Sequence, residues 1–397
     1  MFLPSLFNSY FLGGFECSTH RRRNGRRLDL IAMTGHDRAV AQDYRWMVQH
    51  DIRTVRDGVR WHLIETTPGC YDWSSFLPML HASQEIGVQV IWDLCHYGWP
   101  DDIDIWTPVF VERFSRFARA VATLVRNETD TPAFYCPVNE ISYWSWAGAE
   151  VARFNPCARG RGFELKHQLV RATIAAIEAV WSVDPRARIV QVDPAIHVVA
   201  RPDRPRDRKA AEAYRCAQFQ AWDMLSGRLW PGLGGKPQYL DILGVNYYSD
   251  NQWFLGGKTI ELGHPLYRPF RKILAEVHQR YARPLFVAET GAESEARAPW
   301  LRYIASEVRA AAEVDIPVEG ICLYPITDYP GWTNGRHCKV GLLGLLDHQD
   351  RRAVYAPLAE ELRRQQAIFD SLYRHPEQPD NTADEVVSDA MGQASSS

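Results

Sequence analysis

Two glutamates lie far apart in the sequence, and each one ends a short apolar run. Glu140 follows residues 134–138, and Glu289 follows the uncharged run 284–288. Glycoside hydrolysis needs two carboxyl groups that face each other across the scissile bond, one as acid/base and the other as nucleophile or base. We therefore take Glu140 and Glu289 as candidate catalytic residues for the cleavage of a sugar linkage.

The residues around Glu140 are of types that can bind carbohydrate. Asn139 precedes it, and Tyr143, Trp144 and Trp146 follow it. An amide can hydrogen-bond a hydroxyl group, and aromatic rings offer flat apolar faces to the C–H face of a pyranose. The same stretch also fits a strand end with a capping Asn, an exposed Glu and core aromatic rings. Taken alone, it favours neither interpretation.

The apolar pattern of the chain predicts the elements that position these residues. Eight apolar strands are centred near residues 12, 55, 90, 135, 190, 243, 286 and 321, and the second of them covers residues 52–61. Segments with helical spacing, such as residues 110–125, 162–182 and 210–225, separate most of them. This alternation predicts the α/β class and a single-domain (β/α)8 TIM barrel. A doubly wound sheet is the alternative, but no glycine-rich phosphate-binding fingerprint follows any strand.

Polar residues recur at the carboxyl ends of the predicted strands. They are Glu16, Arg56, Asp93, His96, Asn139, Glu140, Asn246, Tyr248, Glu289, Tyr324 and Asp328. In a TIM barrel the active-site groups come from the C-terminal ends of several strands. One such residue would mean little, but their recurrence around the barrel predicts a shared site.

Length and composition fit one large domain. The chain has 397 residues, of which 46% are hydrophobic, so it can bury a sizeable core. Barrels of this length often form a single domain, and we predict one over residues 1–374. Residues 375–397 contain few apolar side chains, which predicts a disordered C-terminal tail.

Charge and cysteine usage narrow the class of protein. The net charge of −3 implies no general attraction to nucleic acid or to a membrane surface. The eight cysteines form no CxxC pair, which argues against a zinc site and predicts free thiols in a reducing compartment. We therefore expect neither a metal nor a cofactor. Without a basic segment before the apolar N-terminal run, or an apolar run of about 20 residues, the expected location is the cytoplasm.

One segment of the chain is strongly basic. Arginines stand at positions 21, 22, 23, 26 and 27. Such a cluster is usually a solvated loop, and the alternative is an anion-binding lip beside the predicted site.

At this point the sequence resembles the family 1 glycoside hydrolases, over most of residues 11–365. Residues 137–140 (PVNE) resemble the acid/base motif of that family, in which Asn-Glu ends the fourth strand. Residues 288–291 (AETG) resemble its nucleophile motif on the seventh strand, with Ala288 in place of Thr and Thr290 in place of Asn. The resemblance implies retaining hydrolysis of a β-linked glycoside, with Glu140 as acid/base and Glu289 as nucleophile. Retention requires carboxyl groups about 5–5.5 Å apart.

The resemblance also implies roles for other residues. Arg56 would neighbour the nucleophile and keep it ionised, and Tyr248 would orient it. Asn139 would bind the 2-hydroxyl, and alternation places Asn246 on the same strand face as Tyr248. The remaining candidates for substrate binding are His96, Glu16, Trp332 and Trp144, and for the histidine and the tryptophans a place in the core is the rival interpretation.

The sequence departs from the family pattern where the sugar would be recognised. Gly331 stands where the family has a glutamate that binds the 4- and 6-hydroxyls, and Cys338 and Val340 stand where phospho-sugar members carry Lys and Tyr. A carbohydrate substrate is expected, but neither the glycone nor the oligomeric state is indicated. A transglycosylase and a carbohydrate-binding pseudoenzyme are the alternatives, and a metal-dependent barrel hydrolase is the weakest rival because few histidines lie at strand ends.

Overall fold

Eight parallel strands form a closed barrel in a computed structural model that describes residues 6–374. Each strand pairs with the next one around the barrel, and β1 closes it by pairing with β10 and β2. The strands are β1 (Phe11–Gly14), β2 (Thr54–Gly58), β3 (Gln89–Asp93), β4 (Phe134–Cys136), β5 (Arg188–Pro194), β7 (Ile242–Asn246), β9 (Leu285–Thr290) and β10 (Val318–Leu323). The predicted (β/α)8 barrel is confirmed.

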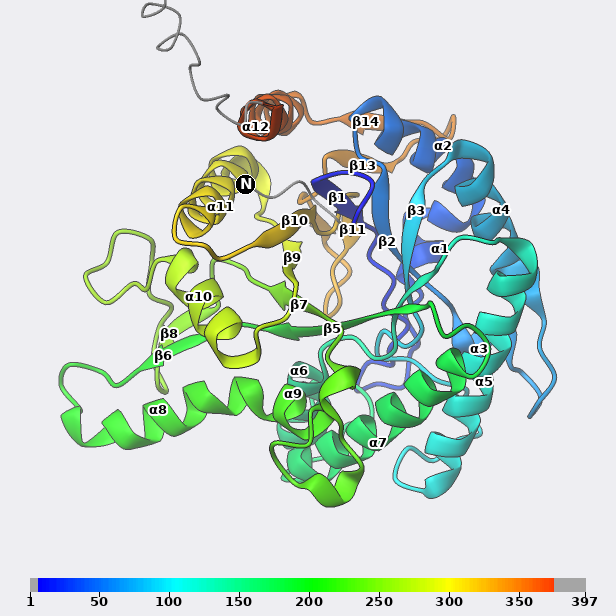
Figure 1. The fold of residues 1–397 in the computed structure, drawn as a ribbon, viewed down its shortest axis with the longest axis horizontal. Coiled ribbons are helices and arrows are strands. Elements are labelled where there is room, and N and C mark those ends of the chain that lie inside the picture. Colours follow the sequence, from blue (N-terminus) through cyan, green and yellow to red (C-terminus); the bar gives the residue numbers. More distant parts are fainter. Residues whose placement is uncertain (1–5, 375–397) are drawn as a thin grey trace, which may run out of the picture.

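Helices surround the strands, as Figure 1 shows. The long ones are α2 (His36–Gln49), α4 (Leu77–Ile86), α5 (Pro108–Glu128), α7 (Gly162–Trp181), α10 (Phe270–Tyr281), α11 (Arg297–Ala312) and α12 (Ala356–Arg374). Helix α5 illustrates why they dock: its buried residues Phe110, Phe114, Phe117 and Val121 recur at three- and four-residue spacing and form one apolar face. That face packs on the buried ring of Trp61, whose centroid lies 5.2 Å from those of both Phe114 and Phe117.

The barrel strands bury both faces, and this divides the core into two layers. Side chains on the inner face, among them Leu12, Ile91, Val190 and Phe286, fill the interior of the barrel. Phe7 packs against Phe286, with ring centroids 4.9 Å apart, and belongs to the same inner cluster. The interior is therefore a packed core rather than a channel, and a site can form only above it, where the strands end.

Shorter elements fill the loops. They are α1 (Leu30–Thr34), α3 (Trp61–Ile64), η1 (Trp73–Ser75), α6 (Ile141–Trp144), the π-helical turn η2 (Ser145–Glu150), η3 (Pro205–Asp207), η5 (Pro231–Leu233), η6 (Pro237–Tyr239), η7 (Ser294–Ala296), and the strand pairs β11 (Tyr329–Pro330) with β12 (His337–Cys338) and β13 (Leu343–Leu346) with β14 (Arg352–Val354). None of the helices in residues 6–374 combines the length and apolar character that a bilayer-spanning segment needs.

The segment expected as one helix over residues 210–225 is broken in the structure. It consists of α8 (Arg208–Cys216), the 3-10 turn η4 (Ala217–Phe219) and α9 (Gln220–Leu225). The break follows from Gln218, whose side chain bonds the backbone N–H and C=O of Ile196 and ties the turn to the loop after β5. That loop contains β6 (His197–Val199), which pairs with β8 (Gln252–Phe254) outside the barrel, near α8 (Figure 1).

One other boundary differs from the expected one, and one expectation is not tested. The strand expected over residues 52–61 ends at Gly58, because Trp61 already begins α3. The expected disordered tail, residues 375–397, lies outside the described residues.

Candidate active site

The two candidate glutamates meet at the C-terminal end of the barrel. Glu289 is the penultimate residue of β9, and Glu140 directly follows the turn after β4. Asn246, the last residue of β7, pairs in register with Glu289, and its side chain reaches Glu140. The barrel therefore brings together two carboxyl groups that are separated by 149 positions in the numbering.

A left-handed turn presents Glu140 to the site. Its backbone has φ 48° and ψ 62°, which is unusual for a residue other than glycine. Two contacts hold the turn: the Glu140 N–H donates to the Val192 carbonyl at 3.1 Å, and the Ser142 N–H donates to Asp193 Oδ1 at 3.0 Å. The Glu140 carboxyl then accepts from Asn246 Nδ2 at 2.9 Å and from the Tyr97 hydroxyl.

The surroundings of Glu140 favour its protonated form. Burial, followed by the nearby charge of Glu289, raises the pKa of Glu140 to about 8, although the hydrogen bonds from Tyr97 and Asn246 oppose this shift. At neutral pH Glu140 therefore holds a proton that it can donate. This is the property that a general acid needs.

The surroundings of Glu289 are of the opposite kind. Arg56 Nη1 lies 3.0 Å from Glu289 Oε1, and the Tyr248 hydroxyl donates to Oε2 at 2.9 Å. A guanidinium and a phenol that both donate to a carboxylate stabilise its charged form and fix its orientation. Each oxygen is thus held from a different strand, β2 and the end of β7.

Arg56 connects the groups beneath the site. Its side chain is fully buried, and besides Glu289 it donates to Asp93 Oδ2 at 2.7 Å and to Asn139 Oδ1 at 3.0 Å. The Asn139 amide in turn lies 3.1 Å from His96 Nε2 and 3.0 Å from the Tyr97 hydroxyl. In this structure Asn139 therefore joins the environments of the two glutamates.

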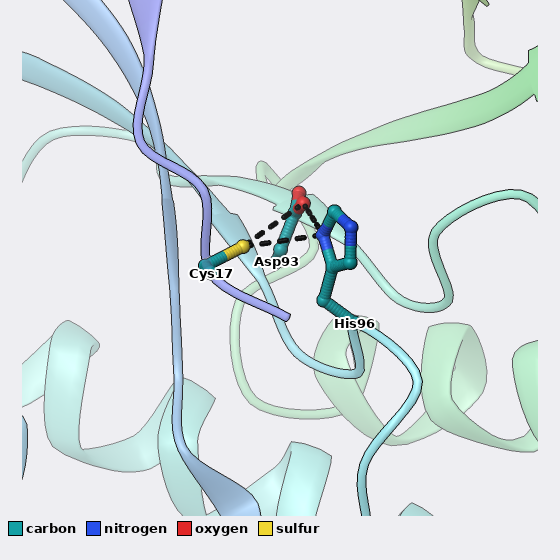
Figure 2. Close-up of side chains that lie close together, drawn as sticks. All are labelled: Cys17, Asp93 and His96. Carbon is teal, nitrogen blue, oxygen red and sulfur yellow. Dashed lines mark hydrogen bonds and ion pairs between the residues drawn. The ribbon is translucent and has the colours of Figure 1, made fainter. Parts of the chain in front are cut away.

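A cysteine, an aspartate and a histidine form part of the floor, and Figure 2 shows them pointing toward one another. Cys17 Sγ lies 3.2 Å from His96 Nδ1 and 3.7 Å from Asp93 Oδ2. These three donor atoms lie within 4.8 Å of each other, a spacing that a metal ion could use. The Asp93 carboxylate, however, already pairs through Oδ2 with the Arg56 guanidinium at 2.7 Å, and that positive charge would repel a divalent cation bound beside it. The cluster is better explained as a hydrogen-bonded floor.

Glu16 lies in the same region, two residues after β1, and is 5% exposed. Burial is the main cause that raises its pKa to about 7, and the charge of Glu289 adds to it, while His96 opposes. Glu16 is thus a third carboxyl group near Glu289. Its role in substrate binding stays a prediction.

The raised pKa of Glu16 makes stability depend on pH. Its ordinary value is 4.5 and its folded value about 7, so the stabilisation is present below pH 4.5 and is lost as pH rises through 7. As pH rises from 4.5 to 8, the free energy of unfolding of the wild type should decrease because Glu16 is forced to ionise. Glu16→Gln has no carboxyl group at this position, so its decrease should be smaller, by up to about 3 kcal/mol. Urea unfolding at both pH values measures this, and identical changes in the two proteins would contradict it.

The aromatic candidates separate into one at the site and one in the core. Trp332 is partly exposed and packs beside His20 and Tyr97, with centroids 4.7 and 5.8 Å away. The expectation that Trp144 is a sugar platform is wrong. Its side chain is fully buried, its indole N–H donates to the Asn155 carbonyl, and its ring packs behind Tyr97.

The arginine cluster forms a rim beside the site. Arg21 and Arg27 both pair with Asp101, so one carboxylate is shared between two guanidinium groups. Arg22 Nη2 donates to the Gly331 carbonyl at 2.9 Å and thereby ties the cluster to the loop that carries Trp332. A cavity of about 470 Å³ adjoins these arginines. The segment is therefore bound to its neighbours and is not a freely solvated loop.

Two residues that support Glu140, one directly and one through Ser142, were not among the sequence candidates. Tyr97 follows His96 but gave no signal of its own, because its hydroxyl reaches Glu140 only through a left-handed backbone with φ 66°. Asp193 ends a predicted strand, and that position was the one available signal. It holds the turn that carries Glu140 through Ser142.

Comparisons with known proteins bear on the fold. A scan against models of protein families finds no match, and a search of curated proteins also finds none. Solved structures do match. A β-glucosidase from Thermotoga maritima in complex with glucoimidazole aligns with a TM-score of 0.73 at 14% identity, over 93% of this chain and 98% of that one. A family 1 β-glucosidase from the same organism aligns with a TM-score of 0.69 at 15% identity, over 84% and 87%. The AHE enzyme from Alicyclobacillus herbarius aligns with a TM-score of 0.72 at 17% identity, over 84% and 87%.

The barrel and its strand ends define a class of protein: (β/α)8 barrels with glutamates at the ends of the fourth and seventh barrel strands. Within that class the chain has the fold of the family 1 β-glucosidases. This is the fold that the motifs at residues 137–140 and 288–291 predicted.

Proposed function

We propose that this protein hydrolyses a β-linked glycoside with retention of configuration. The observation that carries the proposal is the contrast between the two glutamates. Glu289 is bound by a buried guanidinium and a phenol. Burial and the charge of Glu289, in contrast, raise the pKa of Glu140 to about 8, so Glu140 is protonated at neutral pH. Pairs of carboxyl groups in opposite environments divide the roles of nucleophile and acid in glycosidases.

In the first step Glu289 attacks the anomeric carbon and the bond to the leaving oxygen breaks. The proton of Glu140 passes to that oxygen, so the leaving group departs neutral and a glycosyl ester on Glu289 remains. In the second step Glu140, now ionised, takes a proton from water, and the resulting hydroxide attacks the same carbon and releases Glu289. Arg56 and Tyr248 stabilise the carboxylate of Glu289 before and after these steps.

The comparisons support the class of substrate and leave the sugar open. The Thermotoga maritima enzyme is a β-glucosidase that binds glucoimidazole. In this chain Gly331 stands before Trp332, so the contact that would select the 4- and 6-hydroxyls differs. A carbohydrate substrate is proposed here without assigning its glycone. The cytoplasmic location and the single domain over residues 1–374 stay predictions.

Release of nitrophenol from a panel of aryl β-glycosides tests the proposal. The panel holds the glucoside, galactoside, fucoside, mannoside, xyloside and glucuronide, and the variants are Glu289→Gln and, as a surface control, Glu85→Gln. We expect turnover of at least one member by the wild type and the control, and none by Glu289→Gln. Sugar binding without turnover of any member would favour the pseudoenzyme. Transfer of the sugar to an added alcohol in preference to water would favour the transglycosylase.

The pH profile of the active substrate tests the role of Glu140. Because the acid form must be present, kcat/KM should fall as pH rises through about 8.

Asp193 contributes to the raised pKa of Glu140 through its negative charge. Burial raises the pKa of Asp193 itself to about 7, so this residue is mostly ionised at pH 8. Asp193→Asn keeps an acceptor for Ser142 but removes the charge, and we expect its alkaline limb to move to lower pH. The limb should stay in place in the surface control Asp203→Asn, and an unchanged limb in Asp193→Asn would count against the assignment.

A further inference from the structure

A large cavity lies beside the acid/base and has no part in the steps described above. Its volume is about 720 Å³, within the usual range for small-molecule sites. Its walls come from the turn after Glu140, from α7, from the loop after β5, and from the segments around α8 and β8. Among the lining side chains are Tyr143, Trp146, Arg153, Lys166, Tyr214 and Trp253.

The position of this cavity places it on the leaving-group side. Ser142 and Tyr143, two of its lining residues, follow Glu140 in the same turn. Pro194, another, directly follows Asp193, which holds that turn. Because Glu140 delivers its proton to the leaving oxygen, the leaving group must depart on the side of Glu140. A cavity that begins at the Glu140 turn is therefore placed to receive it.

Aromatic side chains dominate two walls of the cavity. The rings of Tyr143 and Trp146 lie 5.9 Å apart on one wall, and those of Tyr214 and Trp253 lie 6.0 Å apart on another. Tyr214 is 38% exposed, so part of its ring is free to contact a ligand. Flat apolar walls of this kind suit a flat apolar ligand such as an aromatic ring.

A buried lysine adds a charge to this apolar space. Lys166 is 8% exposed, and its ammonium donates to the neutral Gln220 Oε1 at 2.9 Å. Within residues 6–374 no carboxylate lies within ion-pair distance of Lys166. The one charged group that raises the pKa of Lys166 is Asp193, and its carboxylate accepts a hydrogen bond from Ser142. A buried ammonium with one neutral acceptor is costly, because two of its donors remain to be satisfied. An anionic ligand group would offset that cost.

The other charged residues of the cavity lie at its exposed rim. Arg153 is exposed, with its guanidinium 4.4 Å from the Trp146 ring, and Glu150 and Asp250 are exposed as well. One oxygen of Glu150 already accepts the Gly162 N–H. The rim thus carries both signs of charge. The buried charge within the cavity is that of Lys166 alone among the described lining residues.

We propose that this cavity is the leaving-group subsite and that it takes an aromatic carboxylic acid, with the ring between the aromatic walls and the carboxylate on Lys166. The cavity's role as a leaving-group subsite rests on the proposed function, and its selectivity for an aromatic anion rests on its own residues. A natural substrate would then be a β-glycoside of a phenol that carries a carboxylate.

Calorimetric binding of two small probes tests the selectivity without any turnover. The probes are 4-hydroxyphenylacetate and its amide, which share the ring and differ in charge. We expect the wild type to bind the acid about tenfold more tightly than the amide, as one buried ion pair can supply. The preference should vanish in Lys166→Met, persist in Lys166→Arg, which keeps the charge, and persist in the surface control Lys272→Met. Equal binding of both probes by the wild type, a preference that survives in Lys166→Met, or tighter binding of a neutral disaccharide than of the acid would overturn the proposal.

Kinetics of the β-glycosides of the same two phenols then test the link to catalysis. The methylene group separates the carboxylate from the phenol oxygen, so the two leaving groups have similar reactivity. We expect a KM about tenfold lower for the acid in the wild type and equal KM values in Lys166→Met. Acid-selective binding without hydrolysis of any glycoside would overturn the proposed function alone. Hydrolysis of both glycosides with equal KM in the wild type would overturn the subsite alone.

Discussion

Replacing Glu289 by Gln should lower kcat on the preferred aryl β-glycoside by about 10⁴-fold or more, equivalent to about 5 kcal/mol of transition-state stabilisation. Glutamine keeps the shape of the side chain but cannot form the glycosyl ester. The variant should remain folded, because Tyr248 and Arg56 keep a polar partner in the same place. Steady-state rates and a thermal melt, measured on the same preparation, separate lost chemistry from lost structure.

Chemical rescue distinguishes the roles of the two glutamates. In Glu289→Ala the vacated space admits azide, which attacks the anomeric carbon from the side of Glu289 and should yield the α-glycosyl azide. In Glu140→Ala the ester on Glu289 still forms from a dinitrophenyl glycoside, which leaves without a proton, and azide should yield the β-glycosyl azide. The opposite pair of products would show that the two roles are exchanged.

Replacing Arg56 by Met should be the most destabilising single change around the site. The guanidinium is fully buried and pairs with both Asp93 and Glu289, so its removal leaves two buried carboxylates without a cation. Breaking a buried pair by removing one partner costs about 3–5 kcal/mol. Activity should fall together with stability, because the Glu289 carboxylate loses the guanidinium that holds its Oε1. Urea unfolding and kcat, measured below the melting temperature, test the two effects separately.

The matched control for this change is Arg45→Met. Arg45 pairs with Glu85 at 3.4 Å, but the side chains are 48% and 72% exposed. Exposed pairs contribute about 0–1 kcal/mol, so this variant should remain close to the wild type. If the two arginine variants proved equally stable and equally active, Arg56 would have no part in holding Glu289.

The parts of the site that lie at strand ends could be predicted from the sequence. Parallel strands in a closed barrel all end at one face, so Glu140, Glu289, Arg56 and Tyr248 had to converge once eight strands were recognised. Their hydrogen bonds in the structure follow from that convergence and from the alternation of side chains along each strand.

The parts that depend on loop conformation could not be predicted. The hydroxyl of Tyr97 reaches Glu140 only because its own backbone is left-handed, which no residue type at that position announces. Trp144 stands among aromatic residues next to Glu140, yet the α6 turn directs it into the core behind Tyr97. Lys166 belongs to an amphipathic helix that was expected, but its place beside a cavity depends on how α7 packs against α9.

Trapping the glycosyl-enzyme tests the central claim most directly. A 2-deoxy-2-fluoro glycoside of the preferred sugar with a good leaving group forms the ester quickly and hydrolyses slowly, because fluorine destabilises the oxocarbenium-like transition state. Intact-mass spectrometry should show one added fluoroglycosyl group per chain, and peptide mapping should place it on Glu289. A label on another residue would contradict the assignment of the nucleophile. Steady hydrolysis of the parent glycoside to a product of inverted configuration, with no label at any time, would contradict the retaining mechanism itself.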